Sequence, residues 1–348
     1  MADHWRPRAS LETLRARSAM VGRVRRFFAE RGVLEVDPPL LQAGANLDHG
    51  VMPMAVGDAG TAFGRRAAVG GYDGQSPSAH DSGASATESS SDKGRGAGPP
   101  GGGGEAPEQK VMSMAVGSAF LPTSPEHPLK RLVAAYHQDV WALAPAFRAG
   151  ERGQRHSPEF RMLEWYRLGW DDVRLADETV EVLRCLTGLD GGIERLAWRE
   201  AWARAGLDPE AVVAAEGFSR DERLDLLLTE HVEPLLGRGC WTVLTDYPAT
   251  GAAQARLRRD AAGRPVAARF ELYRDGIELA NGYHECCDAA ELRARHDAEL
   301  PLHPGCTLDV DFHACLAAGF PDCAGVAVGF DRAVMIALGL PSVAATMI

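Results

Sequence analysis

The sequence predicts an α+β protein with a mixed, mainly antiparallel sheet flanked by helices. The first observation is a two-residue Asp275-Gly276 turn between two strand patterns, which is typical of an antiparallel hairpin. The second is that no G-x-x-x-x-G-K-[ST] loop occurs, and that no G-x-G-x-x-G loop joins a strand pattern to a helix pattern. Parallel-sheet nucleotide folds depend on such loops, so that class is disfavoured.

The chain opens on an amphipathic helix and a short strand. Over residues 11–31 apolar side chains recur at helical spacing, and Gly32 is a natural stop. Residues 33–36 form a strand pattern that runs into Pro38-Pro39. Because proline cannot donate to a sheet ladder, we expect this strand at an edge or an interface.

Residues 57–110 differ in kind from the rest of the chain. Glycine, serine, alanine and proline dominate there, and almost no apolar residue is available to bury, so we expect a disordered segment. Its borders carry a near-repeat, VMPMAVG at 51–57 and VMSMAVG at 111–117, and either copy could fill one strand position. A tolerated surface insertion is the favoured interpretation, with a functional role as the alternative.

The remaining elements follow from apolar periodicity and turn residues. Helices are predicted at residues 123–136, 173–186, 198–205, 220–236, 289–300, 308–318 and 331–338. Strands are predicted at residues 140–148, 160–168, 241–244, 270–273, 277–285 and 325–330. We therefore expect a single domain over residues 1–348, interrupted at 57–110.

Composition places the chain among globular proteins. Its 348 residues are 45% hydrophobic and 24% charged, and a formal net charge of -11 argues against a broad grip on nucleic acid. We find no apolar core of a signal peptide and no apolar run long enough to span a bilayer, so we expect a cytoplasmic protein without a membrane partner. The odd count of 7 cysteines, without a C-x-x-C pair, disfavours a disulfide framework and a structural zinc site.

Two arginines each lie beside a short aromatic or glycine-bearing stretch, Arg148 in 147–160 and Arg332 in 325–332. A guanidinium group is permanently charged and binds phosphate oxygens bidentately. Two of them on separate elements therefore predict a bound triphosphate. Taken singly, each arginine is better explained by a structural partner.

Strict alternation along residues 160–168 separates the two faces of a strand, and one face holds Phe160, Met162, Glu164 and Tyr166. Phe160 could stack on a purine while Glu164 and Tyr166 bind a cationic group beyond it. Core packing is the alternative for Phe160.

The predicted hairpin places two carboxylates together. A turn at Asp275-Gly276 pairs Tyr273 with Glu278 and so sets Glu271 and Glu278 on one face. The two carboxylates repel unless a cation relieves them, and Mg²⁺ that bridges ATP phosphates would do so. A solvated acidic strand face is the alternative.

Simple alternation beyond the hairpin turns Asn281 and Glu285 away from Glu278. We predict a β-bulge at Gly282 that returns both side chains to the cleft of Glu278.

Residues 123–126 fit a capping box, with Thr123 as the cap and Glu126 at the third helical position. A capping role therefore competes with a binding role for Glu126, since a glutamate at a helix start can also face a ligand amine.

Together these segments resemble the catalytic domain of class II aminoacyl-tRNA synthetases of the lysyl type, and most closely the elongation factor P lysine ligase family of truncated lysyl-tRNA synthetase paralogues. Three segments look like the class motifs: 25–39, 147–160 and 325–332. Three others look like lysyl-type signatures: 123–126, 162–166 and 278–285. Their joint occurrence in the right order is highly specific.

The resemblance implies how ATP is held. Arg148 would bind the α-phosphate and the substrate carboxylate, Phe160 would stack on adenine, and Arg332 with Arg155 would bind the γ-phosphate. The full ATP-binding set is Arg148, Glu151, Arg155, His156, Phe160, Glu271, Glu278 and Arg332. Glu271 and Glu278 of this set would bind Mg²⁺. Gly150 stands where the second motif of lysyl synthetases usually has glutamate, which leaves the ATP contact of Glu151 open.

The resemblance also implies how the amino acid is held. Glu126 would bind the backbone-side ammonium and Asn281 the carboxylate, and the full substrate-binding set is Glu126, Arg148, Glu164, Tyr166, Asn281, Tyr283, Glu285 and Ala327. Glu164, Tyr166 and Glu285 of this set would bind the distal ammonium. A substrate with two ammonium groups explains several buried carboxylates, which would be costly without it. Ala327 replaces a glycine of the synthetases, a change that the family associates with (R)-β-lysine over α-lysine.

The implied activity is ATP-dependent ligation. The amino-acid carboxylate would attack the α-phosphorus of ATP, and the adenylate would then pass the amino acid to the side-chain amine of a lysine on elongation factor P. The opening helix leaves no room for the OB-fold that reads the anticodon, so we expect no anticodon-binding domain and no tRNA substrate. A homodimer through residues 11–39 is also implied. The alternatives are the same chemistry with a tRNA or small-amine acceptor, and a catalytically silent regulatory paralogue.

Overall fold

The computed structural model describes residues 5–48, 50–56 and 119–348, which belong to one compact unit. The predicted insertion at 57–110 and the second copy of the near-repeat lie outside the described residues. The first copy contains strand β2 (Met54–Val56), which pairs antiparallel with β3 (Ala119–Leu121). A single domain over the whole chain, without an anticodon-binding domain, stays a prediction.

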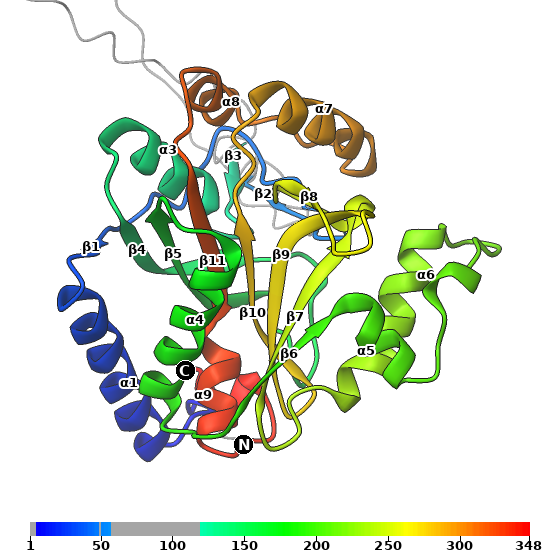
Figure 1. Ribbon diagram of the computed structural model, residues 1–348. Coiled ribbons are helices and arrows are strands. Elements are labelled where there is room, and N and C mark those ends of the chain that lie inside the picture. Colours follow the sequence, from blue (N-terminus) through cyan, green and yellow to red (C-terminus); the bar gives the residue numbers. More distant parts are fainter. Residues whose placement is uncertain (1–4, 49, 57–118) are drawn as a thin grey trace, which may run out of the picture. The chain divides into compact units, whose positions relative to one another are not determined.

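Nine described strands form one mixed sheet in the order β1-β4-β5-β11-β10-β9-β7-β6, with β8 paired to β9 (Figure 1). The strands are β1 (Leu34–Glu35), β4 (Val140–Phe147), β5 (Glu159–Leu168), β6 (Ile193–Ala197), β7 (Trp241–Pro248), β8 (Leu257–Arg259), β9 (Pro265–Arg274), β10 (Ile277–His284) and β11 (Cys323–Gly329). The β1–β4 and β6–β7 pairs are parallel, whereas the other pairs are antiparallel. The predicted α+β class with a mainly antiparallel sheet is confirmed.

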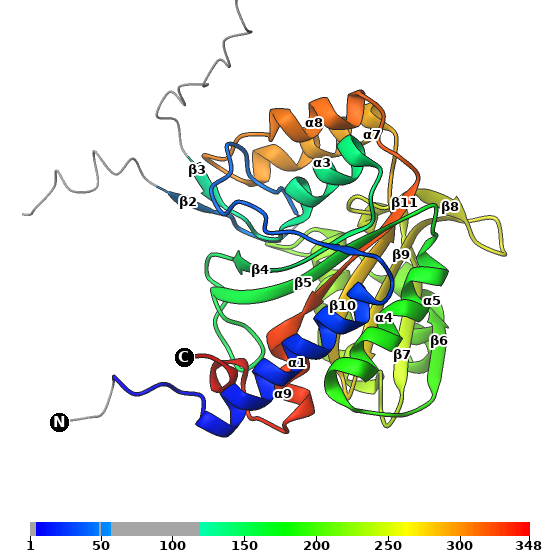
Figure 2. The same ribbon diagram turned by 90° about the vertical axis from the view of Figure 1, so that its left-hand side faces the viewer.

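Helices surround the sheet in three groups. The first contains α1 (Leu11–Ala29) and α4 (Asp172–Thr187), which lie along one face of the sheet, with α9 (Phe330–Ala337) beside them (Figure 2). The second contains α3 (Glu126–Tyr136), α7 (Ala289–Glu299) and α8 (Val310–Ala317), which gather at one end of the strands (Figure 1). The third contains α5 (Trp198–Arg204) and α6 (Arg220–Leu227), on the side of β6 and β7. No helix in the described part of the chain is long and apolar enough to cross a bilayer.

The main core lies between the sheet and the first helix group. The apolar stripe of α1 ends in Phe28, which is fully buried and stacks on Trp141 of β4 with ring centroids 5.0 Å apart. β5 contributes Leu163 and Trp165 to the same core, so the middle of one face of this strand is used for packing. The predicted alternation along β5 is confirmed.

β1 is the terminal strand of the sheet, as the proline pair after it predicts. Its residue Leu34 is 53% exposed, and Leu41 in the following segment is 58% exposed. This edge therefore presents apolar surface.

The secondary structure differs from the sequence prediction in one helix and in two short strands. The helix expected at 220–236 ends at Leu227, and a π-helical turn, Leu228–Val232, and a 3₁₀ turn, Glu233–Leu235, follow it. Pro234 lacks a backbone N–H and its ring obstructs the preceding turn, so a regular helix cannot continue there. The short strands β6 and β8 were not predicted, because sequences as polar as IERLA and LRR carry no apolar alternation.

The hairpin between β9 and β10 has the predicted two-residue turn. Asp275 and Gly276 have φ angles of 53° and 74°, as a type I′ turn requires, and Tyr273 pairs with Glu278. Glu271 and Glu278 therefore share one sheet face, as predicted.

The bulge predicted at Gly282 is wrong in its position. Gly282 pairs regularly with Phe270, whereas the register shifts between Glu278 and Ala280, which makes Leu279 the extra residue of β10. The shift has the predicted consequence, because Asn281 now pairs with Glu271 and shares its face. Gly282 serves a different purpose: an added Cβ would lie 2.4 Å from the ring of Phe270, so only glycine lets that ring approach.

The capping box predicted at 123–126 is also wrong. α3 begins at Glu126 itself, and Ser124 Oγ accepts the backbone N–H of Glu126 at 3.1 Å. Thr123 contributes its backbone oxygen to Arg148 instead of a side-chain cap. The side chain of Glu126 is therefore not used in capping.

Replacing Gly282 by alanine should lower the free energy of unfolding by about 1–3 kcal/mol, because the fully buried Phe270 ring cannot yield without repacking. Denaturant-induced unfolding of the two proteins measures the difference. Gly22→Ala in α1 is the matched control, because a Cβ there meets nothing within 4 Å and alanine favours a helix by up to about 1 kcal/mol. Equal stabilisation by both substitutions would contradict the close packing at Gly282.

Candidate active site

One pocket of about 670 Å³ lies on the sheet face opposite α1 and α4. Its floor is made by side chains that alternate with core residues, as Tyr166 alternates with Trp165 on β5. All the site residues predicted from the sequence line this pocket: Glu126, Arg148, Glu151, Arg155, His156, Phe160, Glu164, Tyr166, Glu271, Glu278, Asn281, Tyr283, Glu285, Ala327 and Arg332. The fold thus gathers residues from α3, four central strands, the β4–β5 connection and α9.

Arg332 lies near the start of α9. The preceding residue, Asp331, connects this helix to β5, because its carboxylate accepts a hydrogen bond from the backbone N–H of Arg161 at 2.7 Å. The Arg332 guanidinium donates to Glu278 Oε2 at 3.1 Å and lies 2.8 Å from His156 Nε2. Burial and the charge of Arg332 lower the pKa of His156, so a neutral imidazole accepts from Arg332. Arg155 donates to the backbone oxygen of Gly276 at 3.0 Å.

Arg148 follows the end of β4. Its Nε donates to the backbone oxygen of Thr123 at 3.3 Å, and its guanidinium carbon lies 5.2 Å from the centroid of the Phe160 ring. Nη1 of Arg148 lies 3.6 Å from Glu151 Oε1, within ion-pair distance. Arg148 is thus held at the pocket wall beside the aromatic ring of Phe160.

The pocket beside the acidic hairpin face contains one carboxylate more than the sequence indicated. Glu271 is buried, ion-paired with Arg269 at 2.5 Å, and accepts hydrogen bonds from Tyr247 and Tyr273. Glu233, which follows the π-helical turn, also lines the pocket. Burial and then the charges of Glu278 and Glu271 raise the pKa of Glu233 to about 7. This part of the pocket therefore holds an excess of acidic groups.

The described residues contain no ready-made cluster of three or more metal-ligating side chains. Mg²⁺ bound with nucleotide phosphates needs only one or two protein carboxylates. Glu271 and Glu278 have the ligand chemistry for that, and the carboxylate of Glu278 accepts a hydrogen bond from Arg332.

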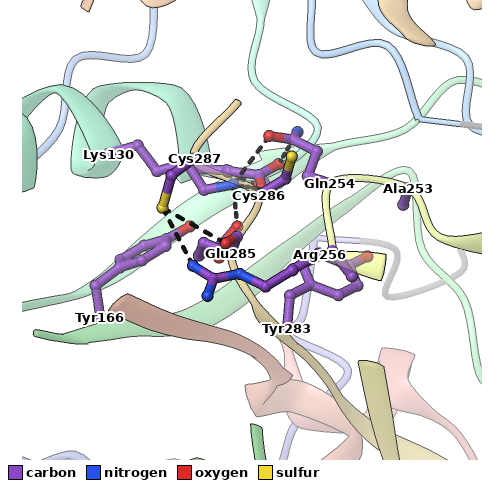
Figure 3. A network of polar contacts seen from close by, with 12 residues as sticks. Lys130, Tyr166, Ala253, Gln254, Arg256, Tyr283, Glu285, Cys286 and Cys287 are labelled. Atoms are coloured by element: carbon purple, nitrogen blue, oxygen red, sulfur yellow. Dashed lines mark hydrogen bonds and ion pairs between the residues drawn. The ribbon is translucent and has the colours of Figure 1, made fainter. Parts of the chain in front are cut away.

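The opposite end of β10 leads into a second acidic group, formed by Glu126, Glu164 and Glu285 around Lys130. Figure 3 shows Lys130 and Glu285 of this group beside Tyr166 and Gln254. Tyr166 donates to Glu164 Oε1 at 2.6 Å. Burial raises the pKa of Glu285 to about 7 even though Lys130 opposes the shift. Burial and then the charge of Glu126 raise the pKa of Glu164 well above its usual range.

Lys130 and Gln254 were not predicted from the sequence. Lys130 lies one helical turn after Glu126, and such i,i+4 spacing of opposite charges is a signal that the sequence offers. Gln254 joins Lys130 and Glu126 from a segment more than a hundred residues away, which no local pattern indicates.

β11 supplies the residues that leave room in the pocket. An added Cβ at Gly325 would lie 2.2 Å from Tyr166 Cε1 and 2.5 Å from Glu285 Oε1. Ala327 pairs with Glu164 on one side and with Asn281 on the other, so its methyl group projects between two predicted substrate contacts.

A family model and the curated relatives place this chain in the same family. A family model described as tRNA synthetases class II (D, K and N) matches residues 99–348. The chain is 33% identical over 360 residues to an elongation factor P–(R)-β-lysine ligase of Yersinia enterocolitica, covering 96% of this chain and 94% of that protein. Proteins of the same name are 34% identical over 365 residues in Salmonella gallinarum (98% and 95% covered) and 32% identical over 367 residues in Avibacterium paragallinarum (99% and 97% covered).

Lysine should bind this pocket more tightly as the pH is raised from about 6 to about 8. In the free protein the pKa of Glu285 is about 7, and a bound ammonium lowers it, so binding below that pH must release a proton. Titration calorimetry in buffers of different ionisation enthalpy measures both the affinity and the proton release. Glu285→Gln should weaken binding and remove most of the pH dependence, whereas an unchanged proton release in that variant would contradict the assignment.

Proposed function

Because the chain belongs to the class II (D, K and N) tRNA synthetase family and, within it, to the elongation factor P–(R)-β-lysine ligases, we propose that it activates a lysine-type amino acid with ATP and transfers it to a lysine of elongation factor P. The observation that carries this proposal is one pocket with arginines and an aromatic ring in one part and three buried carboxylates in another.

ATP use follows from the class II family, and the residues proposed to bind ATP are those gathered around Arg148 and Arg332. Phe160 would stack on the adenine ring beside the Arg148 guanidinium. Arg332 and Arg155 would hold the γ-phosphate, with His156 and Glu151 at the sides. Supporting this, Arg332 and Arg155 each make hydrogen bonds to backbone oxygens that fix their direction.

Glu271 and Glu278 are the residues proposed to hold Mg²⁺. A divalent cation there would neutralise charge that develops on the phosphates as pyrophosphate leaves. The position of Glu233 supports the proposal, because burial and then the negative charges of Glu278 and Glu271 raise its pKa, and a cation held by these two residues would reduce that repulsion.

The lysine-type substrate would lie along β10, where Asn281 and Arg148 would hold its carboxylate. Its distal ammonium would meet Glu285, Glu164 and Tyr166, with Tyr283 lining the path. Glu126 is proposed to bind the amino group near the carboxylate. Ala327, where the synthetases have glycine, supports (R)-β-lysine as the substrate, because one methyl group between Glu164 and Asn281 narrows the space for an α-amino group.

The first chemical step would be attack of the amino-acid carboxylate oxygen on the α-phosphorus. A new P–O bond forms between the carboxylate oxygen and the α-phosphorus. At the same time the bond between the α-phosphorus and the oxygen that bridges to the β-phosphate breaks, which releases pyrophosphate. No protein nucleophile is needed, because Arg148 and Arg332 supply charge stabilisation and the pocket aligns the two reactants.

In the second step the ε-amine of a lysine on elongation factor P would attack the adenylate carbonyl carbon. The new C–N bond forms an amide, the C–O bond to AMP breaks, and the amine loses a proton. The acceptor is proposed from the names of the relatives.

A homodimer through residues 11–39 and a cytoplasmic location are part of the same proposal. The open sheet edge at β1, with Leu34 and Leu41 exposed, supports the homodimer.

Arg148→Ala should reduce lysine-dependent exchange of pyrophosphate into ATP by roughly 10²–10³-fold, because one charge-stabilising donor is lost in a preorganised site. The rate of exchange of labelled pyrophosphate measures it. Arg152→Ala is the matched control, because Arg152 is exposed and is not among the pocket-lining residues. Near-native exchange by the Arg148 variant would show that this arginine does not stabilise the reacting phosphate.

Incubation of elongation factor P with this protein, ATP and (R)-β-lysine should add one lysyl group to one lysine of the acceptor. Intact-mass spectrometry and peptide mapping detect the product, and α-lysine should react more slowly. A tRNA and a small amine, offered in place of elongation factor P, are the matched acceptors. Adenylate formation with lysyl transfer only to one of these would reject the proposed acceptor while keeping the activation chemistry.

A further inference from the structure

Lys130 is a buried cation inside the predicted amino-acid pocket. Its side chain is 1% exposed, and Nζ lies 2.7 Å from Glu126 Oε1, 2.7 Å from Glu285 Oε2 and 2.9 Å from Gln254 Oε1 (Figure 3). Gln254 also donates from Nε2 to Glu126 Oε2 at 2.8 Å. Lys130 therefore joins α3, the end of β10 and the segment before β8 in one polar network.

The charges around Lys130 do not balance within the described residues. Three carboxylates, Glu126, Glu164 and Glu285, face a single ammonium. Glu164 Oε2 and Glu285 Oε1 are buried and accept no hydrogen bond from the described residues. Buried carboxylate oxygens without a donor are costly, so this part of the pocket is suited to a ligand that brings positive charge.

Packing of α3 does not explain the lysine. Its neighbours Leu129 and Val133 are fully buried and already anchor the helix in an apolar cluster. A buried ion pair commonly contributes no more stability than an apolar side chain of similar volume. An electrostatic purpose is the better explanation for a charge at this position.

We propose that Lys130 is a positioning residue for amino-acid recognition, whose resident ammonium neutralises one of three carboxylates and orients Glu126 and Glu285, each toward one ammonium group of the substrate. This inference rests on the proposed function. Its consequence is selectivity: the pocket favours an amino acid with a single distal cation, and a neutral or acidic side chain leaves the remaining carboxylates uncompensated.

Lys130→Met tests the proposal, because methionine keeps most of the volume and removes the charge. The KM for lysine in pyrophosphate exchange should rise by about tenfold or more, whereas the KM for ATP should change little. The rise of kcat/KM with pH should also move to higher pH, because Lys130 favours the ionised form of Glu285 that binds the substrate. The ionisable groups that face Glu285 come from four strands and helices and from the segment after β10: Lys130 and Glu126 of α3, Glu164 and Tyr166 of β5, Tyr283 of β10, Cys323 of β11, and Cys287.

The double variant Lys130→Met/Glu126→Gln removes one positive and one negative charge, so the net charge of the group equals that of the native protein. The dependence of kcat/KM on pH should therefore move back toward the native one. Should Lys130→Met fail to fold, Gln254→Glu adds a carboxylate beside the intact lysine and should also move the profile to higher pH. An unmoved profile, with the KM values for lysine and ATP altered in parallel, would overturn the proposal and leave Lys130 a packing residue.

The native protein separates this inference from the proposed function. If native protein catalyses lysine-dependent exchange and the variant behaves identically, only the role of Lys130 fails. If native protein catalyses no exchange with any lysine isomer, the proposed function fails. The calorimetric pH dependence of lysine binding by the native protein and by Lys130→Met then decides the role of Lys130 on its own.

Discussion

Burial of more negative than positive charge is the constraint on which the pocket depends. The free energy of removing carboxylates from water is unfavourable unless cations or hydrogen-bond donors replace the water. Lys130 supplies part of that replacement for Glu126 and Glu285, and Arg269 supplies it for Glu271. The remainder appears as raised pKa values and as carboxylate oxygens that accept no hydrogen bond from the described residues, which is the electrostatic basis for proposing a ligand that carries ammonium groups.

The central sheet makes this arrangement possible because its two faces have different tasks. One face packs against α1 and α4 and contains the large aromatic residues of the core, among them Trp165. The other face carries the charged side chains, and the register shift at Leu279 keeps Asn281 in phase with Glu271 across the hairpin. Core packing and the pocket are therefore built mainly from alternate residues of the same strands.

The arginines are held by groups that would not compete with a phosphate for all of their donors. Arg332 donates to a backbone oxygen as well as to Glu278, and Arg148 donates to the backbone oxygen of Thr123. Fixed guanidinium groups need little reorganisation when charge develops on a phosphate, which is the physical basis of electrostatic catalysis. Membership of the class II synthetase family agrees with such a site.

The sequence by itself determined the fold class, the type I′ hairpin and the face of β5 that carries Glu164, because turns and strand alternation are local properties of a few consecutive residues. Only the tertiary structure decided that the bulge lies at Leu279, because its position depends on which strand β10 meets and on the close approach of a buried ring to Gly282. The same holds for the pairing of Lys130 with Gln254, since these residues meet only after the sheet and α3 have packed. Helices and strands can be predicted from the periodic spacing of apolar residues, whereas a contact between distant segments produces no such pattern in the sequence.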